Sequence, residues 1–351
     1  MATQTSLPPN LPSSIRTVLQ PDKLSSKLIL TTTQLPQPSH PDDVLVKVHT
    51  TCPGAGELWW MRDYPAVIPA DKLAVPCSDL CGQVVAAPVG SGFRDGDEVY
   101  ARVSPSRPGC AREYTLARTS ELAPKPASLN FAEAAAAPLS ALTAWQALFV
   151  QADSLDAAAL HGDEAARRRN GSRRVLVTGA AGGVGSWVVQ LAALAGAGAV
   201  VAVCSAAKAE AARRLGATEV VDYKANPLPE WIAEDRQGRE CDVVIATVGG
   251  PMLAQCWYAV REGGELISIT GDPAAARPAD VADKTLAKCS FFIVEPLGRI
   301  LREITPLIDA GKVHPVVDSV FELKDIEAAF ERVEKGKAQG KVVVQVDGLR
   351  S

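Results

Sequence analysis

Hydrophobic residues are spaced differently in the two halves of the chain. Up to about Leu139, short apolar runs such as VLVKV from Val44 to Val48 are separated by prolines and glycines. This spacing is typical of β-strands joined by turns, and it predicts two further strands at 84–87 and 98–103. The first part of the chain is therefore expected to be rich in β-structure.

The second half alternates short apolar runs with helical patterns. An alanine-rich stretch at 130–149 predicts a helix, and the polar segment 151–173 is expected to be a helix end followed by an exposed loop. Predicted strands then lie at 175–177, 200–204, 220–223, 242–248 and 265–270, with helices at 206–215 and 252–260 between some of them. Helices of this length between strands predict an α/β fold with a parallel, doubly wound sheet.

A glycine-rich turn lies between the first of these strands and the helix after it. In TGAAGGVGSWVV from Thr178, the positions of a G-x-G-x-x-G fingerprint are occupied by Ala180, Gly182 and Gly185, with Gly179 and Gly183 beside them. Such a turn allows backbone N–H groups and a helix N-terminus to approach a pyrophosphate closely. A dinucleotide site is the first hypothesis, and a glycine-rich turn without a ligand is the alternative.

The residues after the second strand favour NADPH over NADH. In NAD-binding units an acidic residue there accepts hydrogen bonds from the ribose 2′-OH. This chain has Cys204 and Ser205 instead, so no carboxylate would repel a 2′-phosphate. Ser205 can donate to phosphate oxygens, Lys208 can reach the same charge, and Tyr223 can line the pocket. The alternative for Lys208 is an ordinary solvated lysine.

Composition narrows the class of protein. The 351 residues suggest about two domains, and a net charge of −4 provides no basic face for nucleic acid. No window of eighteen uninterrupted apolar residues predicts a membrane span. The N-terminal segment lacks the features of a secretory signal, and a mitochondrial presequence is only weakly indicated because Arg16 is its one base, so we predict a cytoplasmic protein. The eight scattered cysteines are expected to be reduced and buried.

Several segments together resemble the medium-chain dehydrogenase/reductase superfamily, and in particular its zinc-free quinone oxidoreductase and enoyl reductase branch. These segments are VPCSDLCGQVV from Val75, GFRDGDEVYA from Gly92, AAAPLSALTAWQAL from Ala135, the glycine-rich turn, LGATEVVDY from Leu215, and GKAQGKVVVQV from Gly336. The resemblance implies a GroES-like catalytic domain at 1–139 and 297–351 around a Rossmann NADP-binding domain at 140–296. It also implies a homodimer or a monomer.

The ligands of a catalytic zinc are missing from the expected positions. Zinc in the alcohol-dehydrogenase relatives needs thiolate and imidazole ligands, but Gly54 aligns with the first cysteine and Cys77-Ser78-Asp79 contains no histidine. Only Cys110 lies in the region of a structural zinc lobe, and His40, His49, His161 and His314 show no paired spacing. We therefore expect no metal.

Without a metal to polarise an alcohol, hydride delivery to an already activated double bond is the easier reaction. The resemblance implies an NADPH-dependent reductase of an activated C=C bond or a quinone, acting on a small, apolar or conjugated substrate. It implies catalytic roles for Thr143 and for Tyr64, which could supply or orient a proton. The resemblance places further residues near the cofactor: Val184 in the turn, Val248 and Gly249 near the ribose, Phe291, Phe292 and Ile293 near the carboxamide, and Lys341 in the cleft.

The segment 53–60 departs from the family pattern. It reads PGAGELWW where the family commonly has Asn-Pro-x-Asp, so substrate contacts there should differ. Trp59, Trp60 and Trp145 are candidates for the substrate pocket, and plain packing is the alternative for each. Two other functions stay open: an NADPH-binding protein with little redox turnover, and a non-redox enzyme such as a cyclase.

Overall fold

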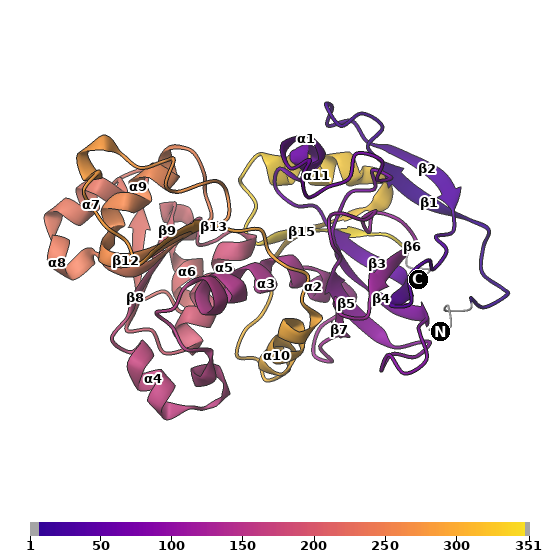
Figure 1. The fold of residues 1–351 in the computed structure, drawn as a ribbon, viewed down its shortest axis with the longest axis horizontal. Helices are drawn as coiled ribbons and strands as arrows, with labels where there is room; N and C mark the ends of the chain where they lie inside the picture. Colours follow the sequence, from indigo (N-terminus) through magenta and orange to yellow (C-terminus); the bar gives the residue numbers. More distant parts are fainter. Residues whose placement is uncertain (1–6, 348–351) are drawn as a thin grey trace. The chain divides into compact units, whose positions relative to one another are not determined.

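The computed structural model describes residues 7–347, and the chain divides into two compact units (Figure 1). The central unit is Thr143–Val294, and the split unit combines Met1–Leu142 with Glu295–Ser351. The functional domains expected at 1–139 with 297–351 and at 140–296 stay a prediction.

The central unit is built on a parallel sheet. In the described part of the chain it has six strands in the order β10-β9-β8-β11-β12-β13, each parallel to its neighbours. The strand order reverses between β8 and β11, which is where ligands bind in open sheets of this kind. The predicted doubly wound parallel sheet is confirmed. Its strands are β8 (Arg174–Thr178), β9 (Ala199–Cys204), β10 (Glu219–Asp222), β11 (Cys241–Ala246), β12 (Val260–Ser268) and β13 (Lys288–Phe291).

Helices connect these strands. The helix after the glycine-rich turn is α5 (Gly183–Leu194), and most of its side chains are buried because apolar residues occupy nearly every position. A helix that is apolar on all sides is one that other elements cover. The remaining helical elements of the unit are η2 (Ala147–Gln151), η3 (Ala157–His161), α4 (Glu164–Asn170), η4 (Ala206–Lys208), α6 (Ala209–Arg214), α7 (Leu228–Glu234), α8 (Arg236–Arg239), α9 (Pro251–Ala259) and η5 (Ala279–Val281).

The split unit is rich in β-structure, as predicted. A sheet of the described residues runs β14-β15-β3-β4-β5-β7, with β6 also paired to β3, while β1 and β2 pair separately. Figure 1 shows the yellow C-terminal strand β15 beside β3 from the first part of the chain, and the two are antiparallel. The strands are β1 (Ser14–Leu19), β2 (Ile29–Gln34), β3 (Asp43–Cys52), β4 (Asp79–Ala86), β5 (Glu98–Arg102), β6 (Tyr114–Arg118), β7 (Leu122–Pro124), β14 (Val317–Glu322) and β15 (Lys341–Gln345).

Two helical predictions need correction. The alanine-rich stretch is not one helix but α2 (Phe131–Ala135), α3 (Pro138–Gln146) and η2. Pro138 explains the break, because proline has no N–H and restricts the residue before it to extended conformations. The segment expected to be a helix end and a loop contains its own helix, α4, whose N-cap Asp163 accepts hydrogen bonds from the N–H groups of Ala165 and Ala166. The other helical elements of the split unit are η1 (Glu57–Trp59), α1 (Trp60–Asp63), α10 (Gly298–Asp309), η6 (Leu323–Asp325) and α11 (Ile326–Glu334).

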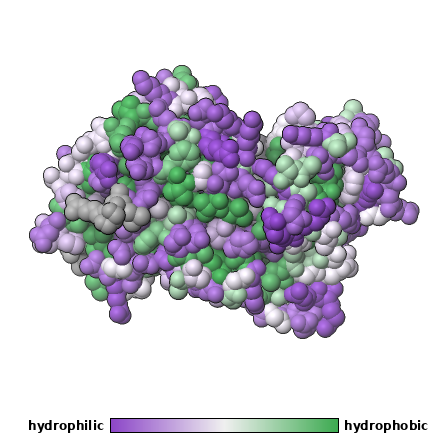
Figure 2. Space-filling model, turned by 180° about the vertical axis from the view of Figure 1, so that it is seen from behind, coloured by the Kyte–Doolittle hydropathy of each residue, from purple (hydrophilic) through white to green (hydrophobic). Residues whose placement is uncertain are grey.

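The surface mixes hydrophilic and hydrophobic residues. Figure 2 shows separate hydrophobic areas among hydrophilic ones on one face. The large apolar side chains that are exposed come from distant parts of the sequence, as Val89, Val150 and Val320 do. Across residues 7–347, every helix is too short or too polar to cross a lipid bilayer.

Candidate active site

The glycine-rich turn brings helix α5 into close contact with the end of β8. Gly179 has a φ of 62°, a conformation that side chains disfavour. A Cβ on Gly185 would lie only 2.2 Å from the carbonyl oxygen of Gly179, so no other residue fits there without moving the helix. The first N–H groups of a helix have no partner within it and attract anions. The turn therefore fits the pyrophosphate of a dinucleotide.

The loop after β11 lies against this turn. Thr247 N–H donates to the Thr178 hydroxyl at 3.0 Å, and the Thr247 hydroxyl donates to the Thr178 carbonyl at 2.6 Å. A Cβ on Gly179 would meet atoms of Thr247 and Val248 within 3 Å. The loops on the two sides of the point where the strand order reverses are therefore tied together.

Most predicted cofactor residues lie at the carboxyl ends of the parallel strands, which share one edge of the sheet. They end or follow β8, β9, β10, β11 and β13, which are separate in the sequence and are brought together by the strand order of the sheet. Phe292 N–H donates to the Ser268 carbonyl at 3.1 Å, which fixes the segment after β13 against the end of β12. This edge collects Ala180, Gly182, Gly183, Val184, Gly185, Ser205, Lys208, Tyr223, Val248, Gly249, Phe291, Phe292 and Ile293.

Charged groups surround Cys204 at the end of β9. Burial raises the pKa of its thiol, and the carboxylate of Asp222 adds to this effect, whereas the cations of Lys208 and Arg213 oppose it. Asp222 is the register partner of Cys204 on β10. Two cations and one carboxylate thus lie near the position where NAD-binding units carry an acid. Arg213 was missed from the sequence because it resembled any exposed helix arginine.

The predicted residues of α3 are buried. Thr143 is 3% exposed and Trp145 is 7% exposed. The Trp145 ring packs against Phe149 at 5.2 Å and against His161 at 6.5 Å between ring centroids. These contacts account for Trp145 by packing, and its place in a substrate pocket stays a prediction.

The split unit contains a buried ion pair at the predicted cofactor lysine. Lys341 Nζ, at the start of β15, lies 2.9 Å from Asp79 Oδ2 and 3.4 Å from the Pro53 carbonyl. The other oxygen of Asp79 accepts a hydrogen bond of 2.6 Å from Leu139 N–H. Burial lowers the pKa of Lys341, but the combined effects of Asp79, Cys52 and Glu57 outweigh it and the net pKa is raised. The ammonium group is therefore held in its charged form.

A row of polar side chains continues from this pair across the sheet. Asp79 on β4 is the register partner of Cys52 on β3 and of Arg102 on β5. Arg102 is 1% exposed, and its Nε and Nη1 atoms lack a hydrogen-bond partner among the described residues. Burial lowers the pKa of the guanidinium, while Asp79 and Glu121 raise it. No sequence pattern predicts this row, because its members come from separate strands.

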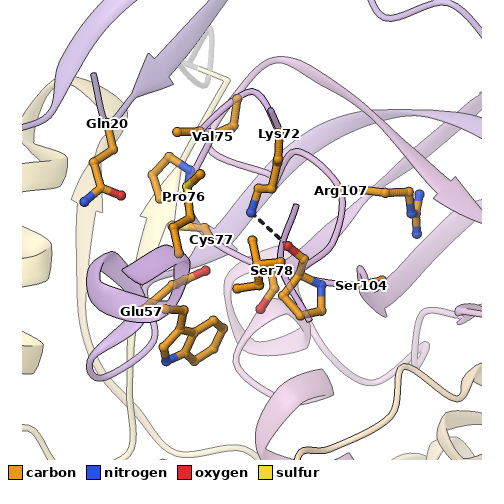
Figure 3. Close-up of a pocket in the computed structure, with 15 residues that line it drawn as sticks. Gln20, Glu57, Lys72, Val75, Pro76, Cys77, Ser78, Ser104 and Arg107 are labelled. Carbon is orange, nitrogen blue, oxygen red and sulfur yellow. Dashed lines mark hydrogen bonds between the residues drawn. The ribbon is translucent and has the colours of Figure 1, made fainter. Parts of the chain in front are cut away.

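A cavity opens in the split unit near this row, and Figure 3 shows the residues that line it. Cys77 lies in its wall with a φ of 69°, a conformation that is uncommon for a residue with a side chain. Trp60 lines the cavity, and its role in a substrate pocket stays a prediction. The lining consists of Gln20, Glu57, Trp60, Met61, Ile68, Lys72, Ala74, Val75, Pro76, Cys77, Ser78, Ser104, Pro105, Arg107 and Gly109.

The other aromatic candidates of this segment lie next to the cavity-lining residues along the chain. The guanidinium carbon of Arg62 lies over the Trp59 ring, 4.9 Å from the ring centroid. Tyr64 is half-buried at the end of α1, and its carbonyl accepts a hydrogen bond from Ile68 N–H. Neither residue is among those that line the described cavity.

The donor set of the site does not fit zinc. Among residues 7–347, no group of three or more histidine, cysteine, aspartate or glutamate side chains is placed to hold a metal ion. Burial raises the pKa of Cys52 and Cys77, so both remain thiols rather than the thiolates that zinc binds. The Asp79 carboxylate is already paired with Lys341.

The basic cluster at 167–174 is occupied by contacts within the protein. Arg167 donates to the Leu194 carbonyl at 2.9 Å, and Arg174 forms a two-bond pair with Glu219 at 2.6 and 2.7 Å. Arg173 lies 3.4 Å from Asp242. These arginines serve the fold of the central unit.

The sequence is similar to known dehydrogenases. A family model described as zinc-binding dehydrogenase matches residues 215–344. A probable zinc-binding oxidoreductase, mitochondrial, of Arthroderma benhamiae is 42% identical, over 96% of this chain and 98% of the relative. The chloroplast envelope quinone oxidoreductase homolog of Arabidopsis thaliana is 34% identical, over 79% and 82%. The NADPH-dependent alkenal/one oxidoreductase, chloroplastic, of the same plant is 36% identical, over 77% and 63%.

The predicted cytoplasmic location is wrong. The Arthroderma benhamiae relative, which matches nearly the whole chain, is named as mitochondrial.

The fold agrees with these relatives. An alcohol dehydrogenase superfamily protein from Novosphingobium aromaticivorans matches with a TM-score of 0.79 and 27% identity, over 95% of this chain and all of that one. The family model, the fungal relative and this solved structure together cover both units of the chain. The chain therefore belongs to the zinc-binding dehydrogenase family of the medium-chain dehydrogenase/reductase superfamily, and it is an oxidoreductase of that NAD(P)-dependent type.

Proposed function

We propose that the protein is an NADPH-dependent reductase that transfers hydride to an activated C=C bond, as in an enone or enoyl compound, or to a quinone, without zinc. The observation that carries the proposal is the turn at β8, where Gly185 packs against Gly179 too closely for any side chain. Such a turn fits a dinucleotide, whose nicotinamide supplies the hydride when it is bound.

The residues around Cys204 support NADPH as the cofactor. A 2′-phosphate there meets the cations of Lys208 and Arg213, and the position that carries an acid in NAD-binding units is a neutral thiol. Asp222 opposes this choice, because its carboxylate also acts on Cys204. The Lys208→Ala variant tests the assignment: it should weaken NADPH binding and leave NADH binding unchanged, and equal NADPH affinity in variant and wild type would refute it.

The other predicted residues have proposed roles in the same reaction. The residues at the carboxyl edge of the central sheet and Lys341 would hold the cofactor, and Thr143 would contact the nicotinamide. Tyr64 would supply or orient a proton, and Trp59, Trp60 and Trp145 would border the substrate. In this proposal, 1–139 and 297–351 form the GroES-like catalytic domain, and 140–296 form the NADP-binding domain.

The missing zinc ligands support an activated acceptor. An enone or a quinone is electrophilic without a Lewis acid, whereas a simple alcohol or ketone needs polarisation. Two relatives have names that fit, since one is called a quinone oxidoreductase homolog and the other an alkenal/one oxidoreductase. We propose a small, apolar or conjugated substrate, a mitochondrial location, and a homodimer or a monomer.

The experiment is an assay of NADPH oxidation with a panel of quinones and enones. Consumption that depends on the acceptor supports the proposal. Tight binding of NADPH without consumption on any acceptor would refute it, and would favour a cofactor-binding protein with little redox turnover.

A further inference from the structure

The wall of the cavity in the split unit is part polar and part apolar, and it contains a carboxyl group, an ammonium group and the guanidinium of Arg107. Trp60, Met61 and Ile68 line the same cavity, and Figure 3 shows Glu57 and Lys72 on its wall. Glu57 belongs to the segment 53–60 that departs from the family pattern, whereas no sequence pattern singled out Lys72. A titratable acid beside a cation in one cavity is an arrangement typical of proton-transfer sites.

The local fold holds the Glu57 carboxyl group in place. Gly56, with a φ of 69°, turns the chain after β3, and Glu57 begins the short helix η1. Its side chain folds back, so that Oε2 accepts a hydrogen bond of 2.8 Å from Gly54 N–H. A Cβ on Gly54 would lie 3.2 Å from that oxygen, which is a tight contact. The two glycines of the sequence GAGE therefore let the Glu57 side chain fold back so that its carboxyl group meets Gly54 N–H.

The surroundings of Glu57 favour its protonated form near neutral pH. Burial raises its pKa to about 7, against the opposing effects of Gly54 N–H, Lys72 and Lys341, while Asp79 adds to the increase. The Arg102 guanidinium and the thiols of Cys52, Cys77 and Cys110 also act on it electrostatically, and the Arg107 guanidinium lines the same cavity. At pH 7 a substantial fraction of the Glu57 side chains carries the proton.

Lys72 supplies the neighbouring positive charge. Its Nζ donates to the Pro105 carbonyl at 3.0 Å, as the dashed line in Figure 3 shows. Burial lowers the pKa of Lys72, and the negative charge of Glu57 opposes that effect. An ammonium group fixed on the cavity wall can stabilise an oxygen on which negative charge develops.

We propose that Glu57 is the catalytic acid of this enzyme, that Lys72 binds the carbonyl oxygen, and that the substrate is an α,β-unsaturated carbonyl compound. The inference rests on the proposed reductase function. A bound nicotinamide would supply the hydride, whose two electrons would reach the β-carbon and convert the C=C bond of the substrate into an enolate. The O–H bond of Glu57 then breaks as a C–H bond forms at the α-carbon. The resulting carboxylate recovers its proton from water.

The test compares variants with two acceptors, but-3-en-2-one and 1,4-benzoquinone, over a range of pH. In Glu57→Gln, the amide oxygen can still accept the Gly54 hydrogen bond, but the side chain has no acidic proton. We expect kcat for the enone to fall about 100-fold or more, with a much smaller change in KM. The wild-type rate should decline as the pH rises through about 7, and the variant should lose this decline. Benzoquinone reduction should change much less, because its product oxygens take protons readily from water.

Glu334→Gln is the matched control. Glu334 accepts a hydrogen bond of 2.8 Å from Gly56 N–H, so it holds the same loop without lining the cavity. This variant should keep both the enone rate and its pH profile. Tyr64→Phe tests the other candidate donor, and it should keep the decline near pH 7.

Each outcome has one meaning. Wild-type enone turnover that Glu57→Gln leaves unchanged would overturn the role of Glu57, as would loss of the pH decline in Tyr64→Phe alone. Equal losses in Glu57→Gln and Glu334→Gln would show that loop geometry, not proton transfer, is responsible. A wild-type enzyme that oxidises NADPH with neither acceptor would instead refute the proposed function itself.

Discussion

Replacing Glu57 by glutamine should change how the stability of the protein depends on pH. The folded protein holds the Glu57 proton more tightly than the unfolded chain does, because burial raises the pKa from 4.5 to about 7. Below pH 4.5 the Glu57 carboxyl group therefore does not lower the free energy of unfolding. Its destabilising effect develops as the pH rises toward 7, where the folded protein must hold a buried carboxylate.

The size of the effect follows from the pKa. At about 1.4 kcal/mol for each pKa unit, an increase from 4.5 to about 7 corresponds to about 3 kcal/mol of lost stability above pH 8. Part of this loss has already occurred at pH 5, so the difference between pH 5 and pH 8 comes to about 2 to 3 kcal/mol. Glutamine does not titrate, so Glu57→Gln should gain this amount relative to wild type over the same interval.

Urea unfolding followed by tryptophan fluorescence measures the difference. The midpoints of wild type and Glu57→Gln should approach each other toward pH 5, and the variant should be more stable at pH 8. Glu334→Gln, which removes a carboxylate from the same loop, reports the contribution of loop contacts. A stability difference between wild type and Glu57→Gln that is constant from pH 5 to pH 8 would refute the reasoning, because it would mean that Glu57 titrates alike in the folded and unfolded states.

Three further predictions concern the other parts of the site. Gly185→Ala should weaken dinucleotide binding at least about tenfold, because its Cβ would lie 2.2 Å from the Gly179 carbonyl oxygen. Titration calorimetry measures the dissociation constant. Gly171→Ala, whose Cβ would lie 3.3 Å from its nearest neighbour, is the control and should bind the dinucleotide as wild type does. Lys341→Met should lower the free energy of unfolding by about 3 to 5 kcal/mol, because it leaves the Asp79 carboxylate buried without its ammonium partner; a loss below about 1 kcal/mol in urea unfolding would contradict this. Incubation with 1,10-phenanthroline followed by dialysis should leave NADPH-dependent turnover unchanged, and recovery of lost activity by added zinc would show that a metal takes part.

The central unit was largely predictable because its signals are local. Val175, Leu176 and Val177 before the glycines, and the apolar residues after them, describe a strand, a turn and a helix in sequence order. The parallel sheet follows from the repetition of this unit. The break at Pro138 was local as well, but the alanine pattern on both sides of it obscured the effect of a single residue.

The contacts of Asp79 in the split unit were not predictable in the same way. Asp79 and Lys341 are far apart in the sequence and meet because β15 returns to pair with β3. Likewise, Cys52, Asp79 and Arg102 form a row only through the register of three strands.

The sequence by itself determined the dinucleotide-binding unit and the lack of residues for a catalytic zinc. Both depend on residue types at neighbouring positions, which the chain displays directly. Only the tertiary structure decided that Glu57 is a partly buried acid that lines one cavity together with Lys72. The proton affinity of a side chain depends on how much water its surroundings exclude and which charges they contain, and in this protein distant segments of the chain supply both.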